Sequence, residues 1–431
     1  MTSSREPGRR PHRLLGVLTA CTALLAAAAC DAGTGTRGAA STSGSASSTA
    51  STASTTGAPT GATAGATATP APSSTTAPAP TCAERLVAGL TPAQRAGQLL
   101  MVGLHPSGSS RELAAQVHAQ RLGGVIYLGG WEGSAAVRTV STRLQTAAAP
   151  TPRGRLGLLI AADQEGGQVQ QLRGQGFSTI PSARTQATLG PTGLERSARA
   201  WSLELRRAGV NVNLAPVADT VPTSLGSGNA PVGQYHRDFV PGDAKANARY
   251  AAAFVRGSLA ADVAPTLKHF PGLGRVRSNT DVSATGITDS TTSATDPYLG
   301  PFREGIAAGA PLVMLSSAYY PRLDAQNPAM FSKAVVTTLL RGRLGFDGVA
   351  ITDDVGAARA VAGVPIGQRA TRFIAAGGDI VLTVNAGQAT TMLAAITARA
   401  AQSPAFASQV RAAATRVVGL KTRLGLASCA S

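Results

Sequence analysis

Residues 244–268 read AKANARYAAAFVRGSLAADVAPTLK, and they contain the unit from which the rest of the fold can be inferred. The first part, 244–261, is rich in Ala and has Arg on its polar positions, which is a helical pattern. The apolar run 264–268 follows, and continuous apolar runs of this length are typical of strands buried on both faces. The segment therefore predicts a helix that leads into a buried parallel strand.

The same unit recurs along the chain. Helical patterns also cover 111–120 and 194–208, and Thr91-Pro92 is a good helix start, with Thr as the N-cap. Eight apolar runs are present, at 98–104, 124–128, 158–162, 210–215, 264–268, 312–316, 348–352 and 379–384. Eight such units predict an α/β fold with a single (β/α)8 TIM-type barrel. A doubly wound open sheet is the alternative, because periodicity alone does not show whether a sheet closes.

The N-terminus has the features of an export signal. Four arginines between residues 5 and 13 precede the apolar stretch 14–29, which ends in small residues before Cys30. We therefore predict a lipoprotein signal peptide over 1–29, lipidation of Cys30 and a membrane-anchored protein that faces the cell wall. Cys21 is an alternative lipidation site with fewer apolar residues ahead of it. A plain signal peptide with an incidental Cys30 is a further alternative.

The next segment, 30–81, consists of Ser, Thr, Ala, Gly and Pro with very few charges, so it cannot bury a core and is predicted to be a disordered linker. The folded body is predicted to cover 82–431. Cys82 opens this body and Cys429 is the third residue from the end of the chain. Because disulfides persist in exported proteins, we expect these two cysteines to be joined.

Composition and charge exclude several classes of protein. The chain has 431 residues and a net charge of +17, and removing residues 1–29 leaves +14, which favours anionic surroundings. No nucleic-acid partner is expected, since the positive charge is dispersed and the chain is predicted to be exported. No run of 18 apolar residues follows residue 30, which excludes a polytopic membrane protein. Four cysteines and five scattered histidines do not form a metal-ligand pattern.

The barrel prediction also indicates where chemistry should occur, because active sites of such barrels lie at the C-terminal ends of the strands. The polar residues at the predicted strand ends are Asp163, Glu165, Asp219, Lys268, His269, Ser316, Ser317, Asp353, Asp354 and Asn385. A single polar residue at a strand end is often a cap or a loop contact. Several carboxylates and a Lys-His pair at one mouth suit an enzyme that acts on a polyhydroxylated substrate.

At these strand ends the sequence resembles glycoside hydrolase family 3, in the branch of β-N-acetylglucosaminidases that trim cell-wall fragments, and exported actinobacterial lipoproteins of this type. The matching segments are 90–104 (LTPAQRAGQLLMVGL), 163–171 (DQEGGQVQQ), 214–219 (LAPVAD), 268–274 (KHFPGLG), 339–354 (LLRGRLGFDGVAITDD) and 376–385 (AGGDIVLTVN). The combination of KHFPG with a later GFDGV-ITDD is highly specific.

The resemblance implies a retaining exo-β-N-acetylglucosaminidase that needs no metal or organic cofactor. We also expect the protein to be a monomer. Its substrates would be amino-sugar glycans or muropeptide fragments, from which it would release terminal N-acetylglucosamine at the cell envelope. Two alternatives remain open. One is a degenerate, non-catalytic lipoprotein that binds glycan, and the other is a family 3 β-glucosidase, although that branch usually adds a second domain.

The resemblance also assigns roles to several of these residues. The nucleophile is the Asp directly after Ser or Thr at the end of strand seven, which is Asp353, so Asp354 is expected to be structural. Asp163 matches the Asp that holds sugar hydroxyls. Lys268 and His269 match the pair that grips the same ring.

Two further positions are assigned less directly. Arg237 of Arg-Asp-Phe stands where the family has Arg-Ser-Phe, and Asp219 is expected to orient the substrate-binding side of the site rather than react. The family has a sugar-contacting Arg where this chain has Gln171. Arg173 is expected to substitute for it from nearby.

The main departure from the family pattern concerns the acid/base. The family has Asp-Ser-His on the loop after strand five, and its His is the acid/base. At the same offset this chain reads Asn279-Thr280-Asp281, and no His follows residue 269. We predict that Asp281 takes the acid/base role, since a carboxyl with a raised pKa can protonate a glycosidic oxygen. The alternative is that Asp281 only caps a turn with its two neighbours.

Overall fold

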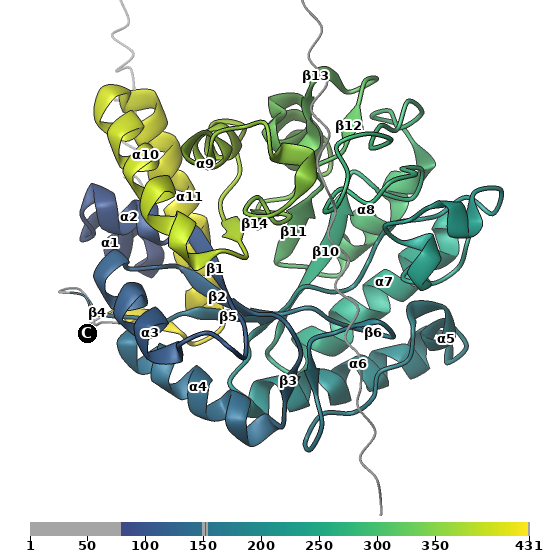
Figure 1. Ribbon diagram of the computed structural model, residues 1–431, viewed down its shortest axis with the longest axis horizontal. Coiled ribbons are helices and arrows are strands. Elements are labelled where there is room, and N and C mark those ends of the chain that lie inside the picture. Colours follow the sequence, from purple (N-terminus) through teal and green to yellow (C-terminus); the bar gives the residue numbers. More distant parts are fainter. Residues whose placement is uncertain (1–78, 149–150, 152–153, 430–431) are drawn as a thin grey trace, which may run out of the picture. The chain divides into compact units, whose positions relative to one another are not determined.

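The computed structural model of this chain describes residues 79–148, 151 and 154–429 (Figure 1). The predicted signal peptide, most of the predicted linker and the candidate lipidation sites Cys30 and Cys21 lie outside the described residues. The first helix, α1 (Cys82–Ala88), begins at Cys82. Thr81 caps the first helix, α1, through a reciprocal capping box with Glu84.

The eight predicted strands form one parallel sheet in the order β14-β11-β10-β9-β5-β2-β1-β15. Their bounds are β1 Leu100–Leu104, β2 Gly124–Tyr127, β5 Leu159–Ala162, β9 Val212–Asn213, β10 Ala264–Phe270, β11 Leu312–Leu315, β14 Val349–Thr352 and β15 Val381–Thr383. The two edge strands meet through a parallel bridge between Ile351 and Ile380, and Thr352 N–H donates to the Ile380 carbonyl at 2.9 Å. The sheet therefore closes into the predicted barrel, and the open-sheet alternative is wrong.

Helices surround the strands (Figure 1). They are α1 Cys82–Ala88, α2 Pro92–Gly97, α3 Ser110–Gln120, α4 Ser134–Ala147, α5 Ala183–Ala187, α6 Gly190–Arg207, α7 Ala244–Leu259, α8 Gly300–Ala307, the π-helix η5 Ala334–Arg343, α9 Ile366–Ala375, α10 Ala389–Gln402 and α11 Pro404–Arg423. The predicted helices correspond to α3, α6 and α7. Thr91 is the N-cap of α2, and Pro92 opens that helix, as expected.

Short strands and 3-10 turns fill the connections. They are β3 Trp131–Glu132, β4 Gly154–Leu156, β6 Gln164–Gly166, β7 Val169–Gln170, β8 Leu172–Arg173, β12 Tyr319–Tyr320, β13 Asp324–Pro328, β16 Ala427–Cys429, η1 Gly226–Gly228, η2 Gly233–Tyr235, η3 Pro297–Leu299, η4 Ala329–Phe331, η6 Arg359–Val361 and η7 Ala386–Gln388. The sequence analysis did not predict these elements, because two or three residues are too few to show a period.

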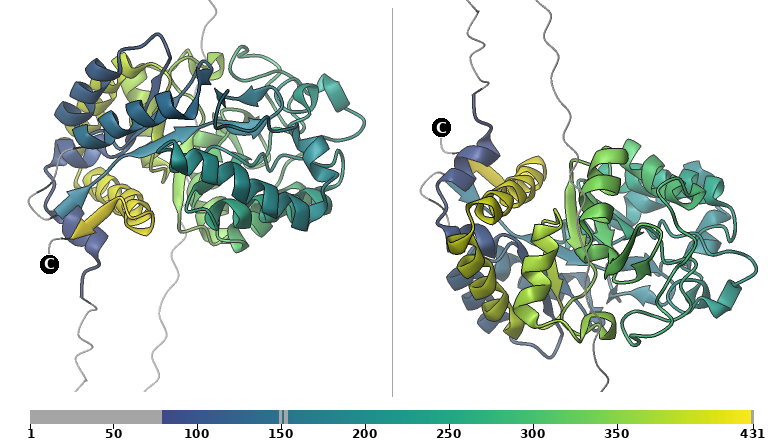
Figure 2. Two further views of the ribbon diagram at one scale, coloured as in Figure 1. Left: turned by 90° about the horizontal axis from the view of Figure 1, so that it is seen from below. Right: turned by 90° about the horizontal axis from the view of Figure 1, so that it is seen from above.

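The two ends of the described body meet beside the N-terminal ends of the strands. Strand β16 pairs antiparallel with β4, and the C-terminal strand lies beside α1 in both views of Figure 2. Cys82 and Cys429 form the predicted disulfide, with their Cα atoms 5.8 Å apart. Helix α11 packs against this end of the barrel, where Arg416 pairs with Asp379 at 2.8 Å just ahead of β15.

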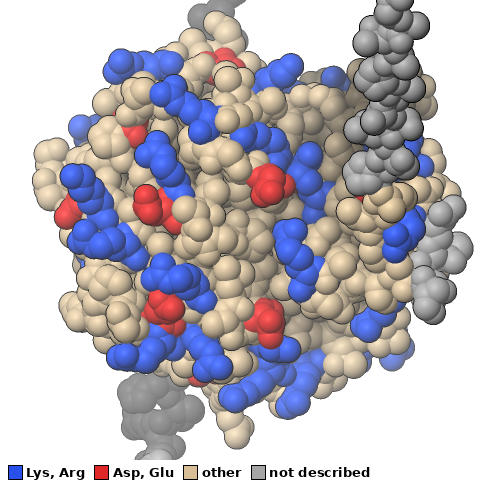
Figure 3. Space-filling model, turned by 180° about the vertical axis from the view of Figure 1, so that it is seen from behind, with Lys and Arg blue, Asp and Glu red and all other residues tan. Residues whose placement is uncertain are grey.

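One hydrophobic cluster includes the barrel interior and the layer between strands and helices. No helix in the described part of the chain is long and apolar enough to cross a bilayer. The described residues also contain no group of three or more His, Cys, Asp or Glu side chains that could hold a metal ion. On the face shown in Figure 3, Lys and Arg are spread out and do not form one stripe. The sequence analysis expected such a dispersed positive charge.

Candidate active site

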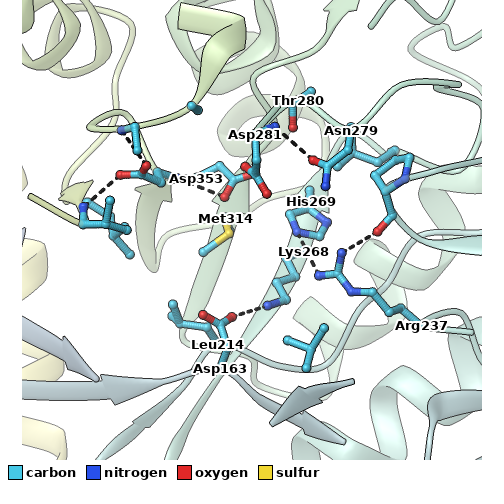
Figure 4. Close-up of a pocket in the computed structure, with 18 of the residues that line it drawn as sticks. Asp163, Leu214, Arg237, Lys268, His269, Asn279, Thr280, Asp281, Met314 and Asp353 are labelled. Carbon is cyan, nitrogen blue, oxygen red and sulfur yellow. Dashed lines mark hydrogen bonds and ion pairs between the residues drawn. The ribbon is translucent and has the colours of Figure 1, made fainter. Parts of the chain in front are cut away.

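A cavity of about 370 Å³ lies at the C-terminal ends of the barrel strands. Its charged and polar lining is Asp163, Tyr235, Arg237, Lys268, His269, Asn279, Thr280, Asp281, Asp353 and Asp354, and its main apolar lining is Ile126, Leu128, Val169, Leu214, Met314 and Leu382. Figure 4 shows the pocket with many of these side chains. The barrel brings these side chains together because parallel strands end at one mouth. Residues more than 200 positions apart in the sequence therefore face one space.

Buried ion pairs hold one wall of the cavity. Lys268, only 2% exposed, extends from β10 and lies 2.5 Å from Asp163 Oδ1 and 2.5 Å from Glu165 Oε1. Arg237 donates to both oxygens of Glu165 at 2.8 Å, which is a bidentate pair. This network fixes Asp163 and Arg237 at the cavity surface.

The electrostatics of this network follow from its geometry. Burial alone would raise the pKa of Glu165, but the charges and hydrogen bonds of Arg237 and Lys268 lower it to about 2. Burial likewise opposes the charge on Lys268, but Asp163 and Glu165 outweigh it and raise its pKa. Glu165, Arg237 and Lys268 therefore all carry their charges at neutral pH.

Asp219 positions His269 from below the cavity. Its Oδ2 lies 2.8 Å from His269 Nδ1, while its Oδ1 accepts the backbone N–H groups of His269 and Leu273. A carboxylate at Nδ1 favours a proton on that nitrogen, which leaves Nε2 facing Arg237 Nη2 at 3.5 Å. Asp219 is 1% exposed and does not line the cavity. Its polar contacts are with His269 and Leu273, so its predicted role of orienting the site is expected to act through His269 rather than by direct contact with a sugar.

Asp353 follows β14 and faces the cavity. Its backbone N–H donates to the Leu315 carbonyl at 3.0 Å, and its Oδ1 accepts the N–H of Asp354 at 2.9 Å. Burial raises the pKa of the Asp353 carboxyl to about 6; charge on His269 opposes this shift, and the Asp281 carboxylate adds to it. The carboxyl is thus poised to change charge in mildly acidic solution.

Asp281 faces the same cavity from the loop after β10 (Figure 4). Its backbone N–H donates to Asn279 Oδ1 at 2.9 Å, and its carboxylate accepts no hydrogen bond from the described residues. The residue is exposed as a whole, but the surrounding loop and cavity wall remove part of its hydration, and this burial raises the pKa of its carboxyl. Two carboxyls with raised pKa values therefore share one cavity, which is an arrangement suited to acid/base and nucleophilic chemistry.

Comparison with known proteins agrees with this geometry. Residues 92–420 match the model of the glycosyl hydrolase family 3 N-terminal domain. The chain belongs to glycoside hydrolase family 3. It is 35% identical to a beta-hexosaminidase of Stenotrophomonas maltophilia strain K279a over 298 aligned residues. The aligned region covers 66% of this chain and 82% of that protein.

Two solved structures are also similar to this chain. The beta-N-acetylhexosaminidase of Beutenbergia cavernae shares 42% identity with a TM-score of 0.71, over 77% of this chain and 99% of that one. A family 3 beta-N-acetylglucosaminidase of Paenibacillus sp. shares 29% identity with a TM-score of 0.68, over 78% of this chain and 63% of that one.

Asp354 has a structural position in this family 3 domain. Its Oδ1 accepts the N–H groups of Gly356 and Val384, and its Oδ2 accepts that of Ala357, at 2.8–2.9 Å. These bonds tie the end of β14 to the end of β15. Asp354 also touches the cavity, but its oxygens already have partners, unlike those of Asp281.

The structure places Arg173 outside the cavity. Its strand, β8, pairs with β3, so the exposed Arg173 side chain lies over a separate depression with Gln168 and Phe177 and donates to the Gln170 carbonyl at 2.8 Å. Arg173 therefore does not replace the sugar-contacting Arg of the family in this arrangement. The sequence analysis did not predict the β6–β7 hairpin, from which Val169 lines the cavity while Arg173, on the following strand β8, does not.

Sequence reasoning noticed Glu165 only as a strand-end residue and gave it no role. Its proximity to Asp163 was a signal that a second carboxylate follows the third strand. The pairing partner Arg237 comes from a distant loop, however, so sequence alone did not show that Glu165 neutralises both cations.

Proposed function

We propose that this protein is a retaining exo-β-N-acetylhexosaminidase that removes terminal N-acetylglucosamine from glycans. The observation that carries the proposal is the pair of carboxyls, Asp353 and Asp281, that face one cavity beside the fixed Lys268–Asp163 pair. The beta-hexosaminidase and beta-N-acetylhexosaminidase names of similar proteins support the sugar class.

In this proposal the ionised network holds the sugar. Asp163 accepts hydrogen bonds from ring hydroxyls. Lys268 and Arg237 donate to these hydroxyls, and His269 donates to them or accepts from them. Because the network is pre-formed, little ordering is needed when the sugar binds. The apolar wall, including Met314 and Leu214, excludes water beside the reacting carbon.

The reaction then proceeds in two steps. The Asp353 carboxylate attacks the anomeric carbon while the protonated Asp281 transfers its proton to the leaving oxygen, which gives a glycosyl ester on Asp353 and a free alcohol. Asp281, now ionised, takes a proton from water, and the resulting hydroxide attacks the anomeric carbon and releases Asp353. Each residue ends in its starting protonation state.

The raised pKa values of both carboxyls suit these roles. When two carboxyls interact, their two protons are lost in two separate steps, and neither step can be assigned to one residue alone. Between these steps, a form in which the two carboxyls share one proton exists over a range of pH. The proposed reaction uses the form in which Asp353 is ionised and Asp281 holds the proton. A direct retaining pair brings its carboxyls to about 5–5.5 Å in the working state.

The proposed location is the outer face of the cell membrane, with muropeptide fragments as natural substrates. The motivation is the signal-like stretch 1–29 ahead of Cys30 and the uncharged linker that follows it. A Cys30→Ala variant should appear in the culture medium or retain its signal peptide. If this variant still sediments with membranes as a processed protein, Cys21 or another anchor is responsible.

The test of the proposed activity compares two chromogenic glycosides. The full chain should hydrolyse an aryl β-N-acetylglucosaminide much faster than the matching β-glucoside. Faster cleavage of the glucoside would favour the family 3 β-glucosidase alternative. Binding of N-acetylglucosamine without turnover of either compound would favour a glycan-binding lipoprotein.

A further inference from the structure

The loop that carries Asp281 is bonded to the segment that follows Asp353. Arg359 N–H donates to the Asp281 carbonyl at 3.0 Å, and Ala360 N–H donates to the Thr280 carbonyl at 3.1 Å. These two backbone bonds connect the loop after β10 to η6, the short turn after β14. We call this pair of bonds the 359–360 bridge.

The segment on the β14 side of the bridge is itself held from outside the cavity. Arg369 of α9, 6% exposed, donates to four carbonyls of this segment, those of Val355, Gly356, Ala362 and Val364, at 2.5–3.4 Å. Arg369 does not line the cavity. One buried guanidinium thus fixes both ends of the segment that donates to the Asp281 loop.

We propose that the 359–360 bridge, supported by Arg369, positions the acid/base Asp281 relative to the nucleophile Asp353. The proposal rests on the roles given to these two aspartates in the proposed function. Arg359 acts through its backbone N–H and Arg369 through the segment it holds, so both are positioning residues.

Two observations favour a positioning role over simple loop anchoring. Asp353 begins the same segment that donates the bridge, so this one segment carries the nucleophile and fixes the backbone of the proton donor. The Asp281 carboxylate has no partner of its own among the described residues, so its location depends on its backbone. That backbone is held by Asn279 on one side and by the bridge on the other. The Asp side chain is shorter than the side chain of the His that the family has at this position. A small shift of the loop would therefore move the Asp281 carboxyl out of contact with the glycosidic oxygen.

One substitution breaks a bond of the bridge and pushes the Asp281 loop away from η6. Arg359 is the first residue of η6, and Ala358 before it has φ −58° and ψ 126°, which is the conformation preferred ahead of Pro. Arg359→Pro therefore suits the φ and ψ of this turn, but it has no N–H for the Asp281 carbonyl, and its ring Cδ displaces that carbonyl from its present position. Arg359→Ala keeps the N–H and removes only the exposed side chain, so it is the matched control.

The readout compares two leaving groups. Loss of proton donation slows cleavage of a natural disaccharide but hardly affects the first step on a dinitrophenyl glycoside, which needs no acid. Arg359→Pro should lower kcat/KM for N,N′-diacetylchitobiose by ~10-fold or more and that for the dinitrophenyl glycoside by less than ~3-fold. Arg359→Ala should stay near wild type on both substrates.

A second variant tests the same proposal in case Arg359→Pro does not fold. Arg369→Lys retains a positive charge but cannot donate to four carbonyls, and it should show the same selective loss on the disaccharide. Thermal unfolding of each variant checks that the barrel is intact. Equal losses on the two substrates for both variants, or no loss for either, would overturn the proposal.

Asp281→Ala separates this proposal from the proposed function. If Asp281→Ala shows the selective loss on the disaccharide but the two arginine variants do not, Asp281 is the acid/base and the bridge does not position it. If Asp281→Ala itself lacks the selective loss, the acid/base assignment fails first, and the bridge proposal falls with it.

Discussion

At the scale of single residues, Asp353 and Asp281 influence each other's charge. The Asp281 carboxylate contributes to the raised pKa of Asp353, after burial and against the effect of His269. Removing the Asp281 charge should therefore lower the pKa of Asp353. The acidic limb of kcat/KM on a dinitrophenyl glycoside follows ionisation of the nucleophile, so Asp281→Asn should move this limb to lower pH.

The control for this shift is Asp243→Asn. Asp243 is exposed and caps α7, and Asn is an equally good N-cap, so the limb should not move. A limb that stays in place in Asp281→Asn, or moves to higher pH, would show that the two carboxyls do not interact as described.

Glu165 provides a second prediction at this scale. Glu165→Gln leaves Lys268 and Arg237 buried with one negative partner fewer, and breaking a buried pair costs about 3–5 kcal/mol. The variant should have a clearly lower Tm and a raised KM. Glu195→Gln breaks an exposed pair with Arg256 and should cost less than about 1 kcal/mol. Similar Tm changes in the two variants would contradict the importance of the buried network.

At the scale of elements, α11 carries a buried lysine that the mechanism does not use. Lys421 is fully buried and donates to Gln98 Oε1 at 2.6 Å, just ahead of β1. Burial lowers its pKa from 10.5 to about 7. Between about pH 7 and 10.5 the unfolded chain therefore binds more protons than the folded one, so this lysine makes stability rise with pH.

Lys421→Met should remove this dependence. Across the same window the free energy of unfolding of wild type should rise relative to that of the variant, by about 1.4 kcal/mol per pH unit at most. Denaturant unfolding of both proteins at several pH values gives this difference. A difference that does not change with pH would mean that Lys421 keeps its ordinary pKa in the fold.

The barrel strands could be predicted from the sequence, whereas the short hairpin and the backbone bonds between loops could not. Each barrel strand is a continuous apolar run, because both of its faces are buried, and such runs are visible without a structure. The strand-end rule then placed Asp163, Lys268 and Asp353 at one mouth. The β6–β7 hairpin is too short to show a period, so the location of Arg173 was missed. The backbone bonds between 280–281 and 359–360 leave no side-chain pattern and could not be predicted.

At the scale of the whole molecule, the disulfide joins the first helix to the last strand of the described body. Cys82 and Cys429 are 347 positions apart, and chain-entropy arithmetic for a loop of that length gives roughly 5–6 kcal/mol as an upper figure. A Cys82→Ala/Cys429→Ala variant should therefore unfold at a lower temperature.

Two measurements check this account of the disulfide. Mass spectrometry of unreduced, trypsin-cut protein should show the two cysteine peptides linked. Calorimetry should show a lower Tm for the double variant. Two freely alkylated thiols in native protein, or an unchanged Tm, would contradict it.

The central claim is that one barrel mouth cleaves β-N-acetylglucosaminides through a covalent bond to Asp353. The most direct measurement is trapping of that intermediate with a fluorinated, activated glycoside, followed by tandem mass spectrometry of the tryptic peptide 344–359. The account predicts one sugar on Asp353 and none in Asp353→Asn. A label on Asp281, Asp354 or Asp163, or hydrolysis with inversion and no trapped sugar, would contradict it.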